Sequence, residues 1–130
     1  MPIFTLEEIK VETGNQSFYK LVKDGRCQFD EFEAEARANN YHAEIKAIYA
    51  YMKKLSNNQT LPREKFKDIT PKKVRVKEYE FKTHHLRVYA IHEPDTGKII
   101  ICGGYKKTQQ NDINHFRIIK MHYIDSRSSR

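Results

Sequence analysis

The spacing of apolar residues changes part-way along this chain, and the change restricts the possible folds more than any other feature. Between residues 28 and 56 apolar residues recur every three or four positions, which is the period of a helix with one buried face. From Val74 to Ile91 they alternate, imperfectly, with polar residues, which is typical of strands. Helices followed by consecutive strands predict an α+β domain.

Two helices are predicted in the first half of the chain. Residues 28–38 are acidic and rich in alanine, with a candidate buried face formed by Phe29, Phe32 and Ala36. Residues 41–55 carry an apolar stripe at helical spacing, made of Tyr41, Ile45, Ile48, Met52 and Leu55. Because only two asparagines separate the segments, the helices are expected to pack as an antiparallel hairpin.

Four strands and a third helix complete the predicted fold. One strand, residues 17–22, precedes the hairpin and ends at the Asp24–Gly25 turn. Short connections join three more strands, which predicts an antiparallel meander with a bulge or break near Lys77. These strands occupy residues 74–81, 86–91 and 98–105. Thr108 is placed to cap a helix that begins near Gln109. The prediction is a twisted antiparallel sheet, built from the meander and the N-terminal strand, with a helical hairpin and a C-terminal helix.

The 130 residues fit one domain, and residues 125–130 are expected to form a disordered polar tail. The sequence has no apolar run of about 18 residues, and Met1–Lys10 lacks the features of a signal peptide. The two cysteines, Cys27 and Cys102, form no CxxC pair, so neither a zinc site nor a disulfide framework is expected. A cytoplasmic protein with no metal, no other cofactor and no membrane partner is predicted.

The net charge of +7 is distributed unevenly along the chain. Residues 1–62 carry eight Lys or Arg against nine Asp or Glu, whereas residues 63–107 carry twelve against six. Residues 108–130 carry four against two. The positive excess therefore lies in the predicted strands and the last helix, as a phosphate-binding or nucleic-acid-binding face requires. A soluble protein that merely has a high isoelectric point could show the same charges.

The candidate functional residues are basic and aromatic side chains of the meander. Lys82, His84, His85 and Arg87 cluster at its first bend. Tyr105, Lys106 and Lys107 lie at the end of its last strand, and Arg75 and Lys77 lie in its first strand. Because the 2′-hydroxyl of RNA is itself a nucleophile, cleavage of RNA needs only groups of these kinds. Lys and Arg stabilise charge that develops on the phosphate, His transfers protons near neutral pH, and Tyr stacks on an unpaired base.

Each of these residues also has an ordinary structural interpretation. The pair His84–His85 could form a polar turn, and Lys106–Lys107 could be a solvated strand end. Glu78 and Glu80 lie in a basic segment, where ion pairing explains them better than acid–base catalysis. The sequence has no GxSxG, P-loop or HExxH motif.

Four short patterns follow one another along the chain: YEFK at residues 79–82, LRVY at 86–89, GGYKKTQ at 103–109 and DI at 112–113. Together they resemble the RelE/HigB toxin superfamily, most closely its HigB-like, phage-derived addiction-module killer branch. The similarity covers about Phe18 to Ile124 and leaves residues 1–17 as an N-terminal extension of one RelE-like domain, residues 1–130.

The resemblance implies the toxin of a type II toxin–antitoxin system. Such a toxin cleaves ribosome-bound mRNA without a metal, leaves a 2′,3′-cyclic phosphate and so inhibits translation. The implied partners are mRNA, the ribosome and a cognate helix-turn-helix antitoxin. Two other functions fit the same fold: a ParE-like toxin that inhibits DNA gyrase, and a non-catalytic module that binds RNA or protein.

The resemblance also assigns roles to residues. Arg87 and Lys82 match catalytic positions of the family, although Lys82 replaces the more usual Arg and lacks its bidentate fork. Lys106 and Lys107 match a Lys pair in a segment that can equally be structural and covered by an antitoxin. His84 and His85 match no family position. The predicted catalytic residues are Arg87, Lys82, His84, His85 and Lys106, and the predicted RNA-binding residues are Tyr105, Lys107, Arg75 and Lys77.

Overall fold

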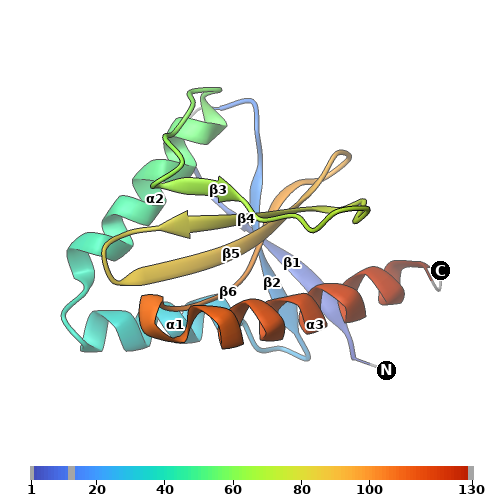
Figure 1. The fold of residues 1–130 in the computed structure, drawn as a ribbon. Coiled ribbons are helices and arrows are strands. Elements are labelled where there is room, and N and C mark those ends of the chain that lie inside the picture. Colours follow the sequence, from blue (N-terminus) through green and yellow to red (C-terminus); the bar gives the residue numbers. More distant parts are fainter. Residues whose placement is uncertain (1, 12–13, 129–130) are drawn as a thin grey trace.

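The computed structural model describes residues 2–11 and 14–128 and contains one sheet with helices on both faces (Figure 1). The strands are β1 (Phe4–Ile9), β2 (Phe18–Lys23), β3 (Phe66–Asp68), β4 (Lys77–Lys82), β5 (Leu86–Glu93) and β6 (Gly97–Tyr105). The helices are α1 (Gln28–Ala38), α2 (His42–Ser56) and α3 (Gln109–Ser128), with a short 3-10 helix, η1 (Lys106–Thr108), between β6 and α3. The strand order in the sheet is β1-β2-β6-β5-β4-β3. The predicted α+β class is confirmed.

The helical hairpin α1–α2 covers one face of the sheet. The predicted stripe residues Phe29, Phe32, Ile45 and Met52 are buried there, packed against residues of β2, β4, β5 and β6 such as Val88. Helix α1 has the predicted bounds, and α2 is shifted by one residue from the predicted segment. Burial of these side chains is the main reason the two helices are stable in this position, since helices of this length are marginal alone.

Helix α3 lies across the opposite face, as Figure 1 shows. Phe116, Ile119 and Tyr123 are buried against β5 and β6. Polar contacts add to this packing, because Glu78 of β4, 2% exposed, binds Lys120 at 2.7 Å and Arg117 at 2.9 Å. A buried carboxylate requires such partners, so these ion pairs hold α3 to the edge of the sheet that lies far from α1.

The predicted meander is confirmed. Strand β4 pairs with β5 and β5 with β6, both antiparallel, and β4 begins at Lys77, where a break was expected. The irregularity lies elsewhere, because Tyr89 pairs with Cys102 and Ala90 with Ile100, so Ile101 is an extra residue in β6. Ile101 and Cys102 consequently face the same core, beneath α3.

Three features of the sheet differ from the prediction. The sheet is mixed rather than antiparallel, because β2 pairs parallel to β6 (Phe18 with Lys98); the helices and three strands that separate them form a crossover long enough for this. Strand β1 lies within the predicted extension 1–17 and pairs antiparallel with β2. The three-residue strand β3 pairs antiparallel with β4. Neither β1 nor β3 was predicted.

The C-terminus also differs from the prediction. Helix α3 continues to Ser128, so the segment predicted as a disordered tail from Asp125 is helical as far as that residue. Hydrogen bonds from the hydroxyl of Ser128 to the carbonyl of Ile124, and from Arg127 to Glu93, support this last turn. Residues 129–130 lie outside the described residues.

Candidate functional site

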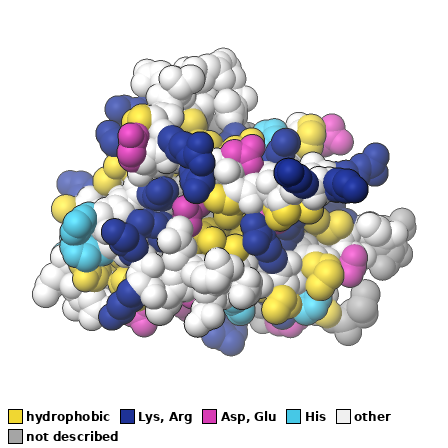
Figure 2. Space-filling model, viewed as in Figure 1, with side chains coloured by type: hydrophobic (Ala, Val, Ile, Leu, Met, Phe, Trp, Pro, Cys, Tyr) yellow, Lys and Arg dark blue, Asp and Glu magenta, His cyan; other side chains and the backbone are white. Residues whose placement is uncertain are grey.

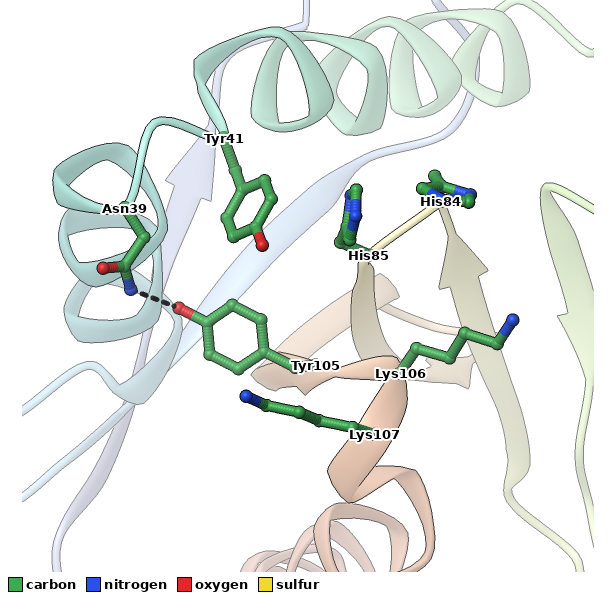
Figure 3. Close-up of a pocket in the computed structure, with 7 residues that line it drawn as sticks. All are labelled: Asn39, Tyr41, His84, His85, Tyr105, Lys106 and Lys107. Carbon is green, nitrogen blue, oxygen red and sulfur yellow. Dashed lines mark hydrogen bonds between the residues drawn. The ribbon is translucent and has the colours of Figure 1, made fainter.

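An open pocket of about 830 Å³ lies where the helical hairpin meets the first bend of the meander and the end of β6 (Figure 3). The residues that line it are Asn39, Tyr41, His84, His85, Tyr105, Lys106 and Lys107. Five of these residues were predicted as functional from the sequence, and they come together because β5 and β6 pair as neighbours. Leu86 is opposite Tyr105 in the ladder, so the residues before Leu86 and after Tyr105 must lie at the same end of the sheet.

The α1–α2 connection supplies the other wall. Asn40 has a left-handed backbone with φ of 69°, a conformation that asparagine tolerates better than most residues. The backbone N–H of Tyr41 then bonds to the carbonyl of Ala36 at 2.9 Å and closes the turn. This tight turn directs Asn39 and Tyr41 toward the end of β6, as Figure 3 shows.

Glu44 of α2 holds the β4–β5 connection in place. Its Oε1 accepts hydrogen bonds from the hydroxyl of Thr83 and from the backbone N–H of His85, the latter at 2.7 Å, while its Oε2 lies 2.7 Å from Nδ1 of His85. Partial burial alone would raise the pKa of Glu44, but the hydrogen bonds from Thr83 and His85 outweigh it and leave the pKa below its usual value. Glu44 is therefore an anion at neutral pH.

The contact with Glu44 fixes the orientation and the tautomer of His85. A carboxylate can only accept, so Nδ1 carries the hydrogen and Nε2 is the ring nitrogen left to exchange a proton with a bound molecule. The His85 side chain is 48% exposed, and its ring centroid lies 4.9 Å from that of Tyr41. The His84 ring is nearly perpendicular to the His85 ring, with 4.3 Å between their centroids. The backbone N–H of Lys106 bonds to the His85 carbonyl at 2.9 Å, which ties η1 to the same loop.

Tyr105 forms the floor between the two walls. Its hydroxyl donates to Oε2 of Glu35 at 3.0 Å and accepts from the side-chain amide of Asn39 at 3.1 Å. Its ring lies 6.0 Å from that of Tyr41 and 5.5 Å from that of Phe32, centroid to centroid. Lys106 and Lys107 leave the strand just after it and extend in opposite directions along the pocket (Figure 3).

The other four predicted site residues do not line this pocket. Arg87 and Lys82 are opposite each other in the β4–β5 ladder. Because side chains alternate along β5 and Tyr89 packs under α3, Arg87 faces that side of the sheet. Arg87 is 5% exposed, and its Nη1 donates to the carbonyls of Thr83 and Leu86 at 2.6 and 2.8 Å.

Arg75 and Lys77 lie at the opposite end of the meander. Lys77 pairs with His92, five residues along β4 from Lys82, which corresponds to about 17 Å of extended chain. Both cations border a separate pocket of about 280 Å³ that also contains His92, Glu93 and Arg127. The structure therefore separates them from the residues at the first bend.

On the face that Figure 2 shows, the Lys and Arg side chains are not gathered into one patch. Figure 2 shows Lys and Arg side chains spread over the face that carries β3, β4 and α3, with Asp and Glu between them. Within residues 2–11 and 14–128, no group of three or more His, Cys, Asp or Glu side chains is arranged to hold a metal ion. In the same part of the chain, no helix combines the length and the apolar character needed to cross a membrane.

Sequence reasoning missed Asn39, Tyr41, Glu44, Thr83 and Glu35. Asn39 was interpreted only as a helix breaker and Tyr41 only as a core residue. Glu44 lies in the first turn of an amphipathic helix, and nothing in its local sequence distinguishes it from a solvated acidic residue. Comparisons of the chain with protein-family models, curated proteins and solved structures found no match.

Proposed function

We propose that this chain is a metal-independent endoribonuclease that cleaves mRNA with His85 as its proton acceptor. The observation that carries the proposal is the Glu44–His85 pair, 2.7 Å apart, at the edge of a pocket that also presents Lys106 and Lys107. An imidazole oriented by a carboxylate is the arrangement that catalysis by proton transfer requires. The lysines supply positive charge where a phosphate would bind.

The reaction needs no group beyond RNA and these side chains. Nε2 of His85 takes the proton of a 2′-hydroxyl, whose oxygen attacks the adjacent phosphorus. The bond from phosphorus to the 5′-oxygen of the next nucleotide breaks, and that oxygen takes a proton from the protonated form of His84. The products are a 2′,3′-cyclic phosphate and a free 5′-hydroxyl, and Lys106 stabilises the extra charge on phosphorus during the transfer.

Arg87 has a positioning role in this proposal rather than direct contact with the phosphate. Its Nη1 is engaged by the carbonyls of Thr83 and Leu86, the two residues that flank the histidine pair. The Arg87 guanidinium thus joins the two ends of the 83–86 loop, while Glu44 binds the backbone N–H of His85 within it. Lys82, opposite Arg87, adds positive charge near the same end of the strand.

The resemblance to RelE/HigB toxins supplies the biological setting of the proposal. A toxin of that kind acts in the cytoplasm on mRNA held by the ribosome, and a helix-turn-helix antitoxin neutralises it. Tyr105 and Lys107 would contact the bound RNA from the floor of the pocket, since base stacking on a tyrosine ring does not depend on sequence. Arg75 and Lys77 would contact only RNA that extends along the whole of β4.

The test is expression of the chain in bacteria, followed by mapping of mRNA ends by primer extension. We expect growth and translation to stop and new mRNA ends to appear. His85→Ala should reduce cleavage by about a hundredfold or more, because a general base contributes that much. His122→Ala is the matched control, since His122 lies exposed on α3 and borders a different pocket.

Two results would refute the proposal. Intact mRNA on expression of the wild-type chain, together with signs of DNA damage, would instead support inhibition of gyrase. Cleavage by His85→Ala at the wild-type rate would show that the Glu44–His85 pair is structural.

A further inference from the structure

An apolar groove of about 300 Å³ lies between α3 and the connection from β3 to β4. Its apolar lining consists of Pro71, Val74, Met121 and Ile124. We propose that this groove, together with the turn at residues 71–74, docks an acidic amphipathic helix of another protein. The inference does not depend on the proposed nuclease, because the groove shares no residue with the pocket at the first bend.

Large apolar side chains are exposed around this groove. Met121 is 54% exposed and Val74 is 37% exposed, and Ile118, one turn before Met121 on α3, is 50% exposed. Among the residues that the structure describes, Ile3 is the one other exposed large apolar residue. On the face shown in Figure 2, hydrophobic side chains lie exposed along α3 beside Lys and Arg side chains. A cluster of exposed apolar side chains with a polar rim is typical of a protein interaction site.

Hydrogen bonds fix the two walls of the groove relative to each other. Arg117 of α3 donates to the carbonyl of Ile69 at 2.9 Å, and Lys120 donates to the carbonyl of Val76 at 2.6 Å. Both cations also bind the buried carboxylate of Glu78. The groove is therefore formed before a partner binds, and docking requires little ordering of this chain.

The turn at residues 71–74 adds positive charge to the surface. Lys72 and Lys73 are its two central residues, both are exposed, and neither forms a salt bridge with a residue that the structure describes. The two carboxylates that line the groove are balanced by two cations, Arg117 and Lys120. The lysines of the turn consequently leave the surface positive in sum, so a partner with acidic residues beside its apolar ones is favoured.

A helix fits this groove better than a strand does. The edge of β4 beside the groove is already occupied, because β3 pairs with β4 and the N–H of Ile69 bonds to the carbonyl of Glu78. A partner strand would therefore find no free edge to pair with here. Ile118 and Met121 lie three residues apart on α3, which is the spacing of a side-chain ridge against which a second helix packs.

A second copy of this chain does not supply such a helix. The apolar stripes of α1 and α2 are buried in the core of the molecule, so the acidic residues of α1 accompany no free apolar face. Pairing of two copies through α3 would place the same positive surface on both sides of the interface, which like charges oppose. The expected partner is therefore a different protein.

Binding of two synthetic helical peptides to the full chain tests this surface. Both peptides carry leucines spaced three and four residues apart over about four turns. One has Glu on its polar face, and the other has Lys at the same positions. We expect the Glu peptide to bind at least tenfold more tightly than the Lys peptide. Because the whole chain is basic, the location of binding is decisive: ¹³C-methyl NMR should show a shift for Met121 and none for Met52, which is fully buried.

Substitutions separate the apolar and the charged contributions to binding of a labelled Glu peptide, followed by fluorescence anisotropy. Ile118→Gln combined with Met121→Gln should weaken binding by about tenfold or more, because two apolar contacts are lost. Ile3→Gln, at an exposed apolar residue outside the groove, is the matched control and should bind as the wild type does. Lys72→Glu combined with Lys73→Glu should abolish the preference for the Glu peptide. The same charge change at the exposed Lys46 and Lys54 of α2 should leave the preference intact.

Several results would overturn the docking surface. Equal affinities for the two peptides, an unshifted Met121 methyl, or a loss of affinity in the apolar double variant no larger than in Ile3→Gln would each do so. A shift of Met121 on addition of poly(U) RNA, with none on addition of the Glu peptide, would instead assign the surface to nucleic acid. None of these results bears on cleavage through His85, so the proposed nuclease is tested separately.

Discussion

Replacement of Glu44 by glutamine is the sharpest test of the proposed chemistry. Two donors, the Thr83 hydroxyl and the His85 backbone N–H, point at Oε1 of Glu44, so the carbonyl oxygen of a glutamine must take that position. Its amide nitrogen then faces Nδ1 of His85, where Oε2 of the carboxylate lies 2.7 Å away in the wild type. A donor facing Nδ1 makes that atom an acceptor and moves the hydrogen to Nε2.

The change of tautomer abolishes the proposed base, because a protonated Nε2 cannot accept the proton of a 2′-hydroxyl. The equivalent exchange of carboxylate for amide in a catalytic triad costs about 10⁴ in kcat, so Glu44→Gln should slow cleavage by about 10³ to 10⁴. The effect on stability should be moderate. The three hydrogen bonds that Glu44 accepts lose their charge assistance, which costs up to about 1 kcal/mol each, and each 1 kcal/mol lowers Tm by about 4 °C.

The assay is cleavage of ribosome-bound mRNA by purified Glu44→Gln, with the His85 tautomer followed by ¹⁵N NMR. Glu64→Gln, an exposed glutamate in the loop between α2 and β3, controls for loss of one negative charge. Cleavage by Glu44→Gln at nearly the wild-type rate would refute the reasoning. So would a slow variant whose His85 still carries its hydrogen on Nδ1, because the loss would then have another cause.

The pKa of Glu44 adds a second readout for the same variant. Because hydrogen bonds hold this pKa below the ordinary value of 4.5, the anion stabilises the fold above that value and the contribution disappears as the pH falls through the folded pKa. The glutamine side chain does not titrate. The difference in unfolding free energy between the wild type and Glu44→Gln should therefore narrow between pH 7 and about pH 3 in urea denaturation. An unchanged difference would contradict the assigned hydrogen bonds.

Three further predictions concern the fold that carries the site. Glu78→Ala should destabilise the protein by about 3 kcal/mol, measured by urea denaturation, because it leaves the buried ammonium of Lys120 without its carboxylate. Adding Lys120→Met to the Glu78→Ala variant should restore at least half of the lost stability. Gly103→Ala should cost about 2 kcal/mol, since a Cβ there would lie 2.3 Å from the buried ring of Phe32; a change in Tm of less than about 2 °C would contradict this contact. Arg87→Met should lower kcat with little change in KM, and Arg87→Lys should recover part of the rate through a single donor to the loop; equal loss in both variants would argue for direct contact of the guanidinium with the phosphate.

The sequence specifies the elements of this fold better than their arrangement. Helix α1 and the meander follow from periodicity and turn residues, which act locally, and both were predicted. The parallel pairing of β2 with β6 joins residues about 80 positions apart, such as Phe18 and Lys98, and no local pattern records it. Strand β1 lies at the edge of the sheet and is largely exposed. The alternation of apolar and polar residues along it is therefore too weak to distinguish a strand from a loop in the sequence.

The residues of the candidate site also fall into two groups, those that local strand pairing predicts and those that depend on the tertiary fold. The meander alone implies that His84, His85 and the residues after Tyr105 meet, because they lie at one end of paired antiparallel strands. The same reasoning places the residues around Lys77 at the other end of β4, so their separation was already implied by the strand direction. Residues supplied by the helical hairpin depend on how it docks, which is a property of the whole core rather than of any segment.

Glu44 illustrates why that dependence matters for function. Two neighbouring histidines on a hairpin bend are an ordinary polar turn, and their presence predicts no proton transfer. Packing of Ile45 and Ile48 beneath the sheet fixes the rotation of α2, and this rotation brings the carboxylate of the preceding residue onto Thr83 and His85. The core thus selects the tautomer of a surface histidine. A substitution that rotates α2 should consequently impair cleavage without touching any residue of the pocket.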